Sequence, residues 1–76
     1  MADKRIERMR RNPKDVRPDE LDAVMIRAGF TSHQEGSHKV YRRGPGERIS
    51  VPQRKPHLRQ VYVEEALELL GEGGVG

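Results

Sequence analysis

Apolar residues recur with helical spacing in two segments of the chain, one near the middle and one near the end. The two sets are Leu21, Val24, Met25 and Ala28, followed by Val63, Ala66, Leu67 and Leu70. Each set stands at i, i+3, i+4 and i+7, which places its members on one face of a helix. The spacing therefore predicts amphipathic helices over residues 18–28 and 61–70. Pro18 suits a first turn, and Gly29 suits a left-handed cap at the end of the first helix.

Three strand-like runs lie between these helices, at residues 30–35, 38–43 and 48–52. Short turn-forming stretches, Gly-Ser and Gly-Pro-Gly, separate them, which favours an antiparallel meander. A three-stranded sheet needs a cover on one face. We therefore expect an α+β fold with two layers in the order α-β-β-β-α, both helices lying on one face of the sheet.

The direction of the side chains in the second strand has consequences for the chemistry. Neighbours in a strand point to opposite faces. If Val40 faces the helices, then Tyr41 faces outward, and His38 lies with Val40 at the rim of the core. Phe30 is expected to pack under the first of the two helices.

The chain has 76 residues, which is enough for one small domain. Residues 18–72 are expected to form that domain, and residues 73–76 a disordered tail. Residues 1–17 are expected to be a basic arm or a short helix that docks weakly. Their apolar stripe is thin, Ile6 and Met9 alone, and Pro13 interrupts the helical pattern.

Composition excludes several classes of protein. The chain has no cysteine, so it holds no disulfide and no thiolate metal site. It has no apolar run of about 18 residues, as a membrane-spanning helix requires. The charged start does not resemble a secretory signal, and we expect a cytoplasmic location. The three histidines lack the partners and spacing of a zinc site, and we expect no metal cofactor.

The charges are distributed unevenly along the chain. The net charge is +3, but basic blocks at residues 1–17 and 36–60 alternate with acidic blocks at 18–35 and 61–76. The second basic block holds seven Lys or Arg residues and one Glu. Such clustering favours an anionic partner, and nucleic acid is the leading one.

His38 stands inside this second basic block and is the candidate catalytic residue. Histidine takes and gives protons near neutral pH. RNA carries its own nucleophile, the 2′-hydroxyl, so its cleavage needs a base, an acid and positive charge near the phosphate. The candidate RNA-binding residues around it are Gly36, Ser37, Lys39, Arg42, Arg43, Arg48, Arg54 and Lys55. His33 and His57 are expected to be surface residues, with a minor case for His33 as an assistant to His38.

Four short motifs occur in order: Ala28-Gly29-Phe30, Gly36-Ser37-His38, Val40-Tyr41 and Val51-Pro52. Together with the closing helix they resemble the HicA family of toxin–antitoxin toxins over residues 18–72. The resemblance implies a fold similar to double-stranded-RNA-binding domains, metal-independent cleavage of mRNA, and neutralisation by a HicB antitoxin. The catalytic histidine of the family corresponds to His38. Many members have a second histidine directly after it, where this chain has Lys39.

Two other interpretations stay open. A nonenzymatic RNA-binding module on the same fold would use the basic block to contact phosphates. Against it, true double-stranded-RNA binders have a Lys-rich start to the last helix, where this chain carries Glu64, Glu65 and Glu68. Alternatively, the basic face docks an acidic antitoxin, which is compatible with the toxin. The free protein is expected to be a monomer or a small oligomer.

Overall fold

The computed structural model describes residues 4–70 of the chain. It contains three helices and three strands in the order α1 (Lys4–Arg11), α2 (Pro18–Arg27), β1 (Thr31–Glu35), β2 (His38–Arg43), β3 (Glu47–Pro52) and α3 (Gln60–Leu69). The predicted helices and strands agree with α2, α3 and the three strands to within a few residues at each end. The expected tail, residues 73–76, lies outside the described residues.

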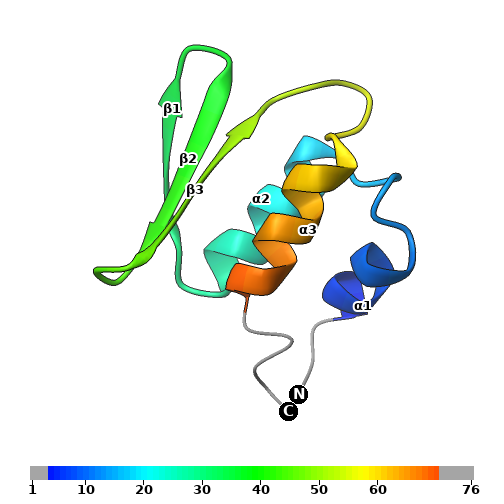
Figure 1. Ribbon diagram of the computed structural model, residues 1–76, viewed down its shortest axis with the longest axis horizontal. Helices are drawn as coiled ribbons and strands as arrows, with labels where there is room; N and C mark the ends of the chain where they lie inside the picture. Colours follow the sequence, from blue (N-terminus) through cyan, green and yellow to red (C-terminus); the bar gives the residue numbers. More distant parts are fainter. Residues whose placement is uncertain (1–3, 71–76) are drawn as a thin grey trace.

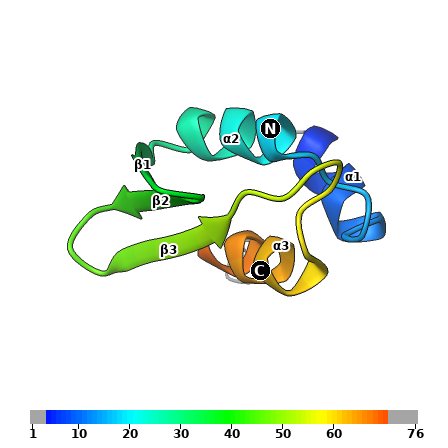
Figure 2. The same cartoon turned by 90° about the horizontal axis from the view of Figure 1, so that it is seen from above.

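The strands form one antiparallel sheet in the order β1-β2-β3. Helices α2 and α3 lie side by side on one face of it (Figures 1 and 2). The α+β architecture with a three-stranded antiparallel sheet is therefore confirmed. The β1–β2 connection is two residues long, with φ of +60° at Gly36 and a negative φ at Ser37. This is the pattern of a type II′ hairpin turn, whose first central position favours glycine.

Helix α2 ends as its sequence predicts. Gly29 has φ of +99°, a backbone conformation that glycine adopts without strain. Its N–H donates to the carbonyl of Ile26, and the N–H of Phe30 donates to that of Met25. These two bonds form a Schellman motif, which satisfies carbonyls left free at the end of the helix. The chain then turns directly into β1, and Phe30 is buried as expected.

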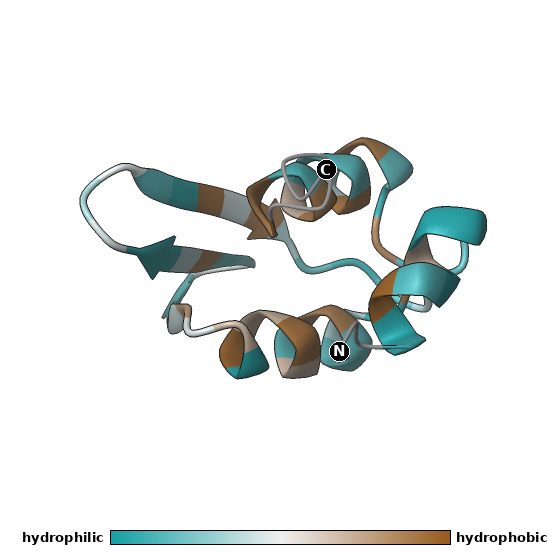
Figure 3. Ribbon diagram, turned by 90° about the horizontal axis from the view of Figure 1, so that it is seen from below, coloured by the Kyte–Doolittle hydropathy of each residue, from teal (hydrophilic) through white to brown (hydrophobic). Residues whose placement is uncertain are grey.

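One continuous core joins the sheet to the two helices that cover it. Its members from these elements are Leu21, Val24, Met25, Tyr41, Ile49, Val51, Val63, Ala66 and Leu67. Figure 3 shows apolar residues recurring among polar ones along α2 and α3, whereas α1 is mostly hydrophilic. The helical spacing in the sequence therefore identified the buried faces of both covering helices correctly.

The orientation of Tyr41 differs from the sequence-based expectation. Tyr41 is fully buried and pairs across the sheet with Ile49, so it faces the helices. Its hydroxyl donates a hydrogen bond to Oδ1 of Asp22 in α2, at 2.9 Å. A buried tyrosine is stable when its ring is packed and its hydroxyl has a partner, and α2 supplies both. Val40 and His38 consequently point to the opposite face, and His38 is exposed there instead of lying at the rim of the core.

The N-terminal segment buries more apolar side chains than the sequence indicates. Helix α1 lies against α2 and α3 on the side away from the sheet (Figures 1 and 2). Met9 and Val16 are fully buried, and the backbone N–H of Leu58 donates to the carbonyl of Val16 at 2.8 Å. A short helix is present there as α1, and Val16, an isolated apolar residue outside any helical pattern, also reaches the core.

Candidate functional site

The face of the sheet turned away from α2 and α3 is here named the open face. Directly opposed residues of an antiparallel pair point to the same face, so the pairing register defines its members. They are Thr31, His33 and Glu35 from β1, His38, Val40 and Arg42 from β2, and Arg48, Ser50 and Pro52 from β3. Two of the three histidines and two arginines of the chain therefore share one surface.

His38 is the first residue of β2 and follows the tight turn directly. The side-chain amide of Gln34 donates to the carbonyls of Gly36 and His38, at 2.9 and 3.2 Å. These bonds fix the backbone on both sides of Ser37. The imidazole of His38 is exposed on the open face, opposite Glu35. The turn therefore presents the histidine to solvent from a firmly held backbone.

A second titratable pair lies beside His38. Val40 pairs with His33, which places His33 diagonally across from His38, about 7 Å away between Cα atoms. Nε2 of His33 lies 3.5 Å from Oε2 of Glu35. Glu35 was not among the sequence-based candidates. The sequence contains a signal for Glu35. It stands two residues after His33, so both face the same side of β1, and the two-residue turn places it opposite His38.

The two arginines of the open face oppose each other. Arg42 pairs with Arg48, so their Cβ atoms are about 5 Å apart. Both are exposed, and within residues 4–70 neither guanidinium has a hydrogen bond or an ion pair. Like charges directly opposite one another in a sheet are unfavourable. An anion bound between them would relieve this repulsion.

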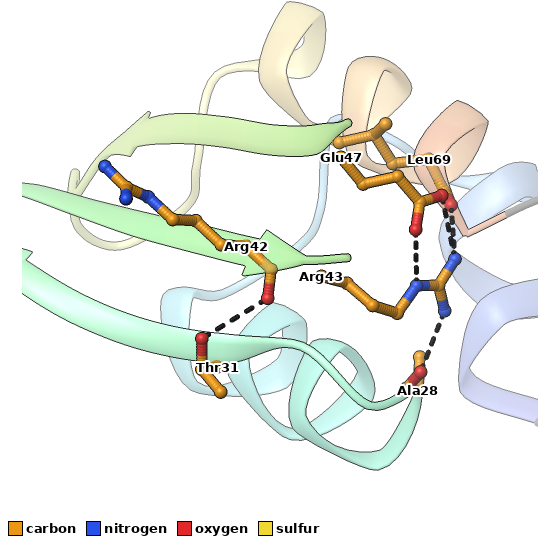
Figure 4. Close-up of polar contacts among 6 residues, drawn as sticks. All are labelled: Ala28, Thr31, Arg42, Arg43, Glu47 and Leu69. Carbon is orange, nitrogen blue, oxygen red and sulfur yellow. Dashed lines mark hydrogen bonds and ion pairs between the residues drawn. The ribbon is translucent and has the colours of Figure 1, made fainter. Parts of the chain in front are cut away.

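Arg43 belongs to the other face and has a structural environment (Figure 4). Its Nε and Nη2 donate to the two carboxylate oxygens of Glu47 at 2.6 and 2.9 Å. Nη1 and Nη2 also donate to the carbonyls of Ala28 and Leu69, at 2.8 and 3.2 Å. The guanidinium carbon lies 4.4 Å from the ring centroid of Phe30. Arg43 therefore ties the ends of α2 and α3 to the sheet, and all three guanidinium nitrogens donate within the protein.

The hydrogen-bonded pair of Arg43 and Glu47 stabilises both charges. The side-chain hydrogen bond raises the pKa of Arg43 and holds the pKa of the Glu47 carboxyl below its usual value. Both groups are therefore ionised over the whole physiological range.

Lys39 also lies on the helix-facing side. Its Nζ is 2.9 Å from Oδ1 of Asp22, the same oxygen that accepts the hydrogen bond of Tyr41. Burial, followed by the bond to Asp22, raises the pKa of Tyr41 well above its ordinary value, so this hydroxyl keeps its proton. The structure does not bring Lys39 to the surface that carries His38.

The remaining candidates surround the turn and the loop after β3. Gly36 and Ser37 are exposed, and the N–H of Gln53 donates to the carbonyl of Ser37 at 2.8 Å. Arg54 and Lys55 follow Gln53 directly and are exposed. The loop between β3 and α3 thus begins beside the turn that presents His38.

Two further findings concern the part of the chain that the structure describes. No three His, Cys, Asp or Glu side chains are grouped there so as to hold a metal ion. None of its helices is long and apolar enough to cross a membrane.

Comparison of the chain with models of protein families, with curated proteins and with solved structures finds no match. The functional argument therefore depends on the residues of the open face and their surroundings.

Proposed function

We propose that this chain is a toxin of the HicA type, a metal-independent endoribonuclease that cleaves mRNA. The observation that carries the proposal is the open face, where an exposed His38 lies on the same surface as the unpartnered Arg42 and Arg48. The element order from α2 to α3 and the motifs around His38 add the resemblance to this family and to double-stranded-RNA-binding domains. A toxin of this kind acts in the cytoplasm, where its mRNA substrate is found.

The chemistry requires two proton transfers. The imidazole of His38 accepts the proton of a 2′-hydroxyl, whose oxygen attacks the adjacent phosphorus and displaces the 5′ oxygen. The products are a 2′,3′-cyclic phosphate and a 5′-hydroxyl. The proposed general acid is His33, whose Nε2 lies 3.5 Å from Oε2 of Glu35 and which would return a proton to the departing oxygen. Arg42 and Arg48 lie about 13 Å further along the open face, where they would contact the phosphates of neighbouring nucleotides.

The proposed protein partner is an antitoxin similar to HicB. An acidic inhibitor that covers the open face would meet Arg42 and Arg48 and would screen His38 from RNA. Such a surface attracts the inhibitor by the same electrostatic complementarity that attracts RNA.

A nonenzymatic RNA-binding module is the competing function. It would use the same two arginines, but it would not require His38 to exchange protons. The exposed acids of α3, Glu64, Glu65 and Glu68, disfavour a mode in which α3 contacts the phosphate backbone. Substitution of His38 separates the two functions, because it affects cleavage and leaves the arginines in place.

The test is to induce the wild type and His38→Ala in a bacterial host and to follow growth and full-length mRNA. We expect wild type to arrest growth and shorten mRNA, and His38→Ala to do neither, because removal of an acid–base group costs about 10²- to 10⁴-fold in rate. Purified wild type should cut RNA in the presence of a chelator. Equal unfolding midpoints in urea control for folding, since His38 is exposed. Equal behaviour of the two variants in growth and RNA integrity would eliminate the endonuclease.

A further inference from the structure

The segment before α2 and the loop before α3 are in direct contact through Asp15 and Val16 on one side and His57 and Leu58 on the other. The N–H of Leu58 donates to the carbonyl of Val16, and both side chains are buried. Nε2 of His57 lies 2.7 Å from Oδ1 of Asp15. These contacts place residues that are some forty positions apart in the sequence on adjoining walls of one surface.

Between these walls lies a pocket of about 310 Å³. Its charged or titratable lining residues are Lys14 from the first wall and Arg54, His57 and Arg59 from the second. Pro56, Leu58 and Gln60 complete the lining. No carboxylate lines it, although Asp15 lies beside His57, so the positive charge of the pocket comes from Lys14, Arg54 and Arg59.

The nearby acidic groups already have partners. Oδ1 of Asp15 lies 2.7 Å from Nε2 of His57, and Oδ2 lies 3.8 Å from a guanidinium nitrogen of Arg8. Glu20 pairs with the same arginine at 2.8 Å. The cations Lys14, Arg54 and Arg59 are exposed and have no partner within residues 4–70. Clustering of like charges without a counter-charge is unfavourable, and it is typical of a surface that binds an anion.

We propose that this basic pocket, lined by Lys14, Arg54, His57 and Arg59, binds a backbone phosphate of the RNA substrate. The inference rests on the proposed function for its ligand. Arg54 stands one residue after Gln53, whose N–H bonds the carbonyl of Ser37 beside His38. The loop that carries Arg54, His57 and Arg59 therefore begins beside the turn that presents His38.

The lining favours a phosphate over an acidic peptide. Arginine guanidinium groups bind phosphate oxygens through pairs of parallel hydrogen bonds. A protein partner would need apolar anchor sites at the centre of its interface. The apolar lining here consists of Pro56 and Leu58, and Leu58 is 2% exposed because it packs in the core. The pocket also assigns a role to the basic N-terminal block, because Lys14 supplies one of its walls.

The experiment compares two double variants of the full chain with equal loss of charge. Lys14→Ala with Arg59→Ala removes two pocket cations, and Lys4→Ala with Arg11→Ala removes two exposed cations of α1 that do not line it. Each pair is placed in a His38→Ala background, which prevents cleavage. Binding of a fluorescent single-stranded RNA oligonucleotide is measured by anisotropy over a range of salt concentrations. An acidic peptide of equal charge is measured in parallel.

We expect the pocket variant to lose about tenfold in RNA affinity. The slope of log affinity against log salt should fall by about 1.4, at about 0.7 for each lost contact with a single strand. The control pair should lose no more than about twofold. Equal losses in both pairs would overturn the proposal. It would also fall if Lys14 and Arg59 were needed for binding of the peptide but not of RNA.

Failure of the pocket proposal can be distinguished from failure of the endonuclease proposal. If RNA affinity depends on the pocket but wild-type protein leaves RNA intact, the pocket stands and the catalytic function falls. If wild type cuts RNA and the two double variants bind alike, the catalytic function stands and the pocket falls.

Discussion

Arg42 and Arg43 are neighbours in β2, yet they belong to two very different regions of the molecule. Arg43 faces the helices, where its guanidinium meets Glu47, two backbone carbonyls and the ring of Phe30. Arg42 faces the open side, opposite Arg48, and its guanidinium has no partner among residues 4–70 (Figure 4). One side of the sheet uses arginine to hold the fold together, and the other presents it to solvent.

The difference shows that the net charge of residues 36–60 is larger than the charge that these residues present on the open face. Lys39 and Arg43 contribute to the basic block, but each is paired with a carboxylate on the helix-facing side. The surface around His38 keeps Arg42 and Arg48. The first of the following experiments compares two substitutions of one residue on the helix-facing side. The other two compare a residue of the helix-facing side with a residue of the open face.

The largest effect is expected at Tyr41, the centre of the helix-facing side. Replacement of Tyr41 by Ala should lower the free energy of unfolding by about 3–5 kcal/mol, because it leaves a cavity and removes one of the two partners of Asp22. Tyr41→Phe keeps the ring and should cost about 1 kcal/mol for the lost hydrogen bond. Urea denaturation measures both. A cost for Tyr41→Ala no larger than that for Tyr41→Phe would contradict the buried position.

The second effect contrasts the two neighbouring arginines directly. Arg43→Ala should lower the free energy of unfolding by about 2 kcal/mol, because it frees two carbonyls and a carboxylate at a partly buried position. Arg42→Ala should change it by no more than about 0.5 kcal/mol. Thermal and urea unfolding of the two variants provide the comparison. Equal stabilities would show that the contacts of Arg43 are dispensable.

The smallest effect concerns the affinity for RNA, where the residue of the open face is expected to be the sensitive one. Arg42→Ala should weaken binding of single-stranded RNA about fivefold and reduce the salt slope by about 0.7. Lys39→Ala removes the same charge from the helix-facing side and should leave both values near those of the parent. Both changes are made in the His38→Ala background and measured by anisotropy. A greater loss of RNA affinity for Lys39→Ala than for Arg42→Ala would contradict binding of RNA at the open face.

Most of the fold could be predicted because each element carries a local signal. Apolar spacing identified α2 and α3, Gly29 marked the end of α2, and short turns indicated an antiparallel meander. The N-terminal segment could not be placed in this way. Val16 enters the core through contact with Leu58, a pairing distant in sequence that no periodic pattern announces.

The orientation of the side chains in β2 was not predicted, and it places two of the candidate residues on the helix-facing side. Val40 and Tyr41 are adjacent and both suit a buried position, so the pattern of β2 is compatible with either facing the helices. The choice between them assigns Lys39 and Arg43 to one face and His38 and Arg42 to the other. The hydrogen bond from Tyr41 to Asp22 is a tertiary contact, and local sequence does not contain it.

The type II′ turn at Gly36 and Ser37 has a consequence for how the chain tolerates length changes. Side chains alternate with a period of two, so one residue inserted in this turn would shift β2 by one position relative to β1. Such a shift would carry His38 to the helix side and bring Arg43 into water. The turn closes in two residues because Gly36 accepts a positive φ that other residues adopt with strain. A residue without a side chain thereby determines which side chains of β2 lie on each face of the sheet.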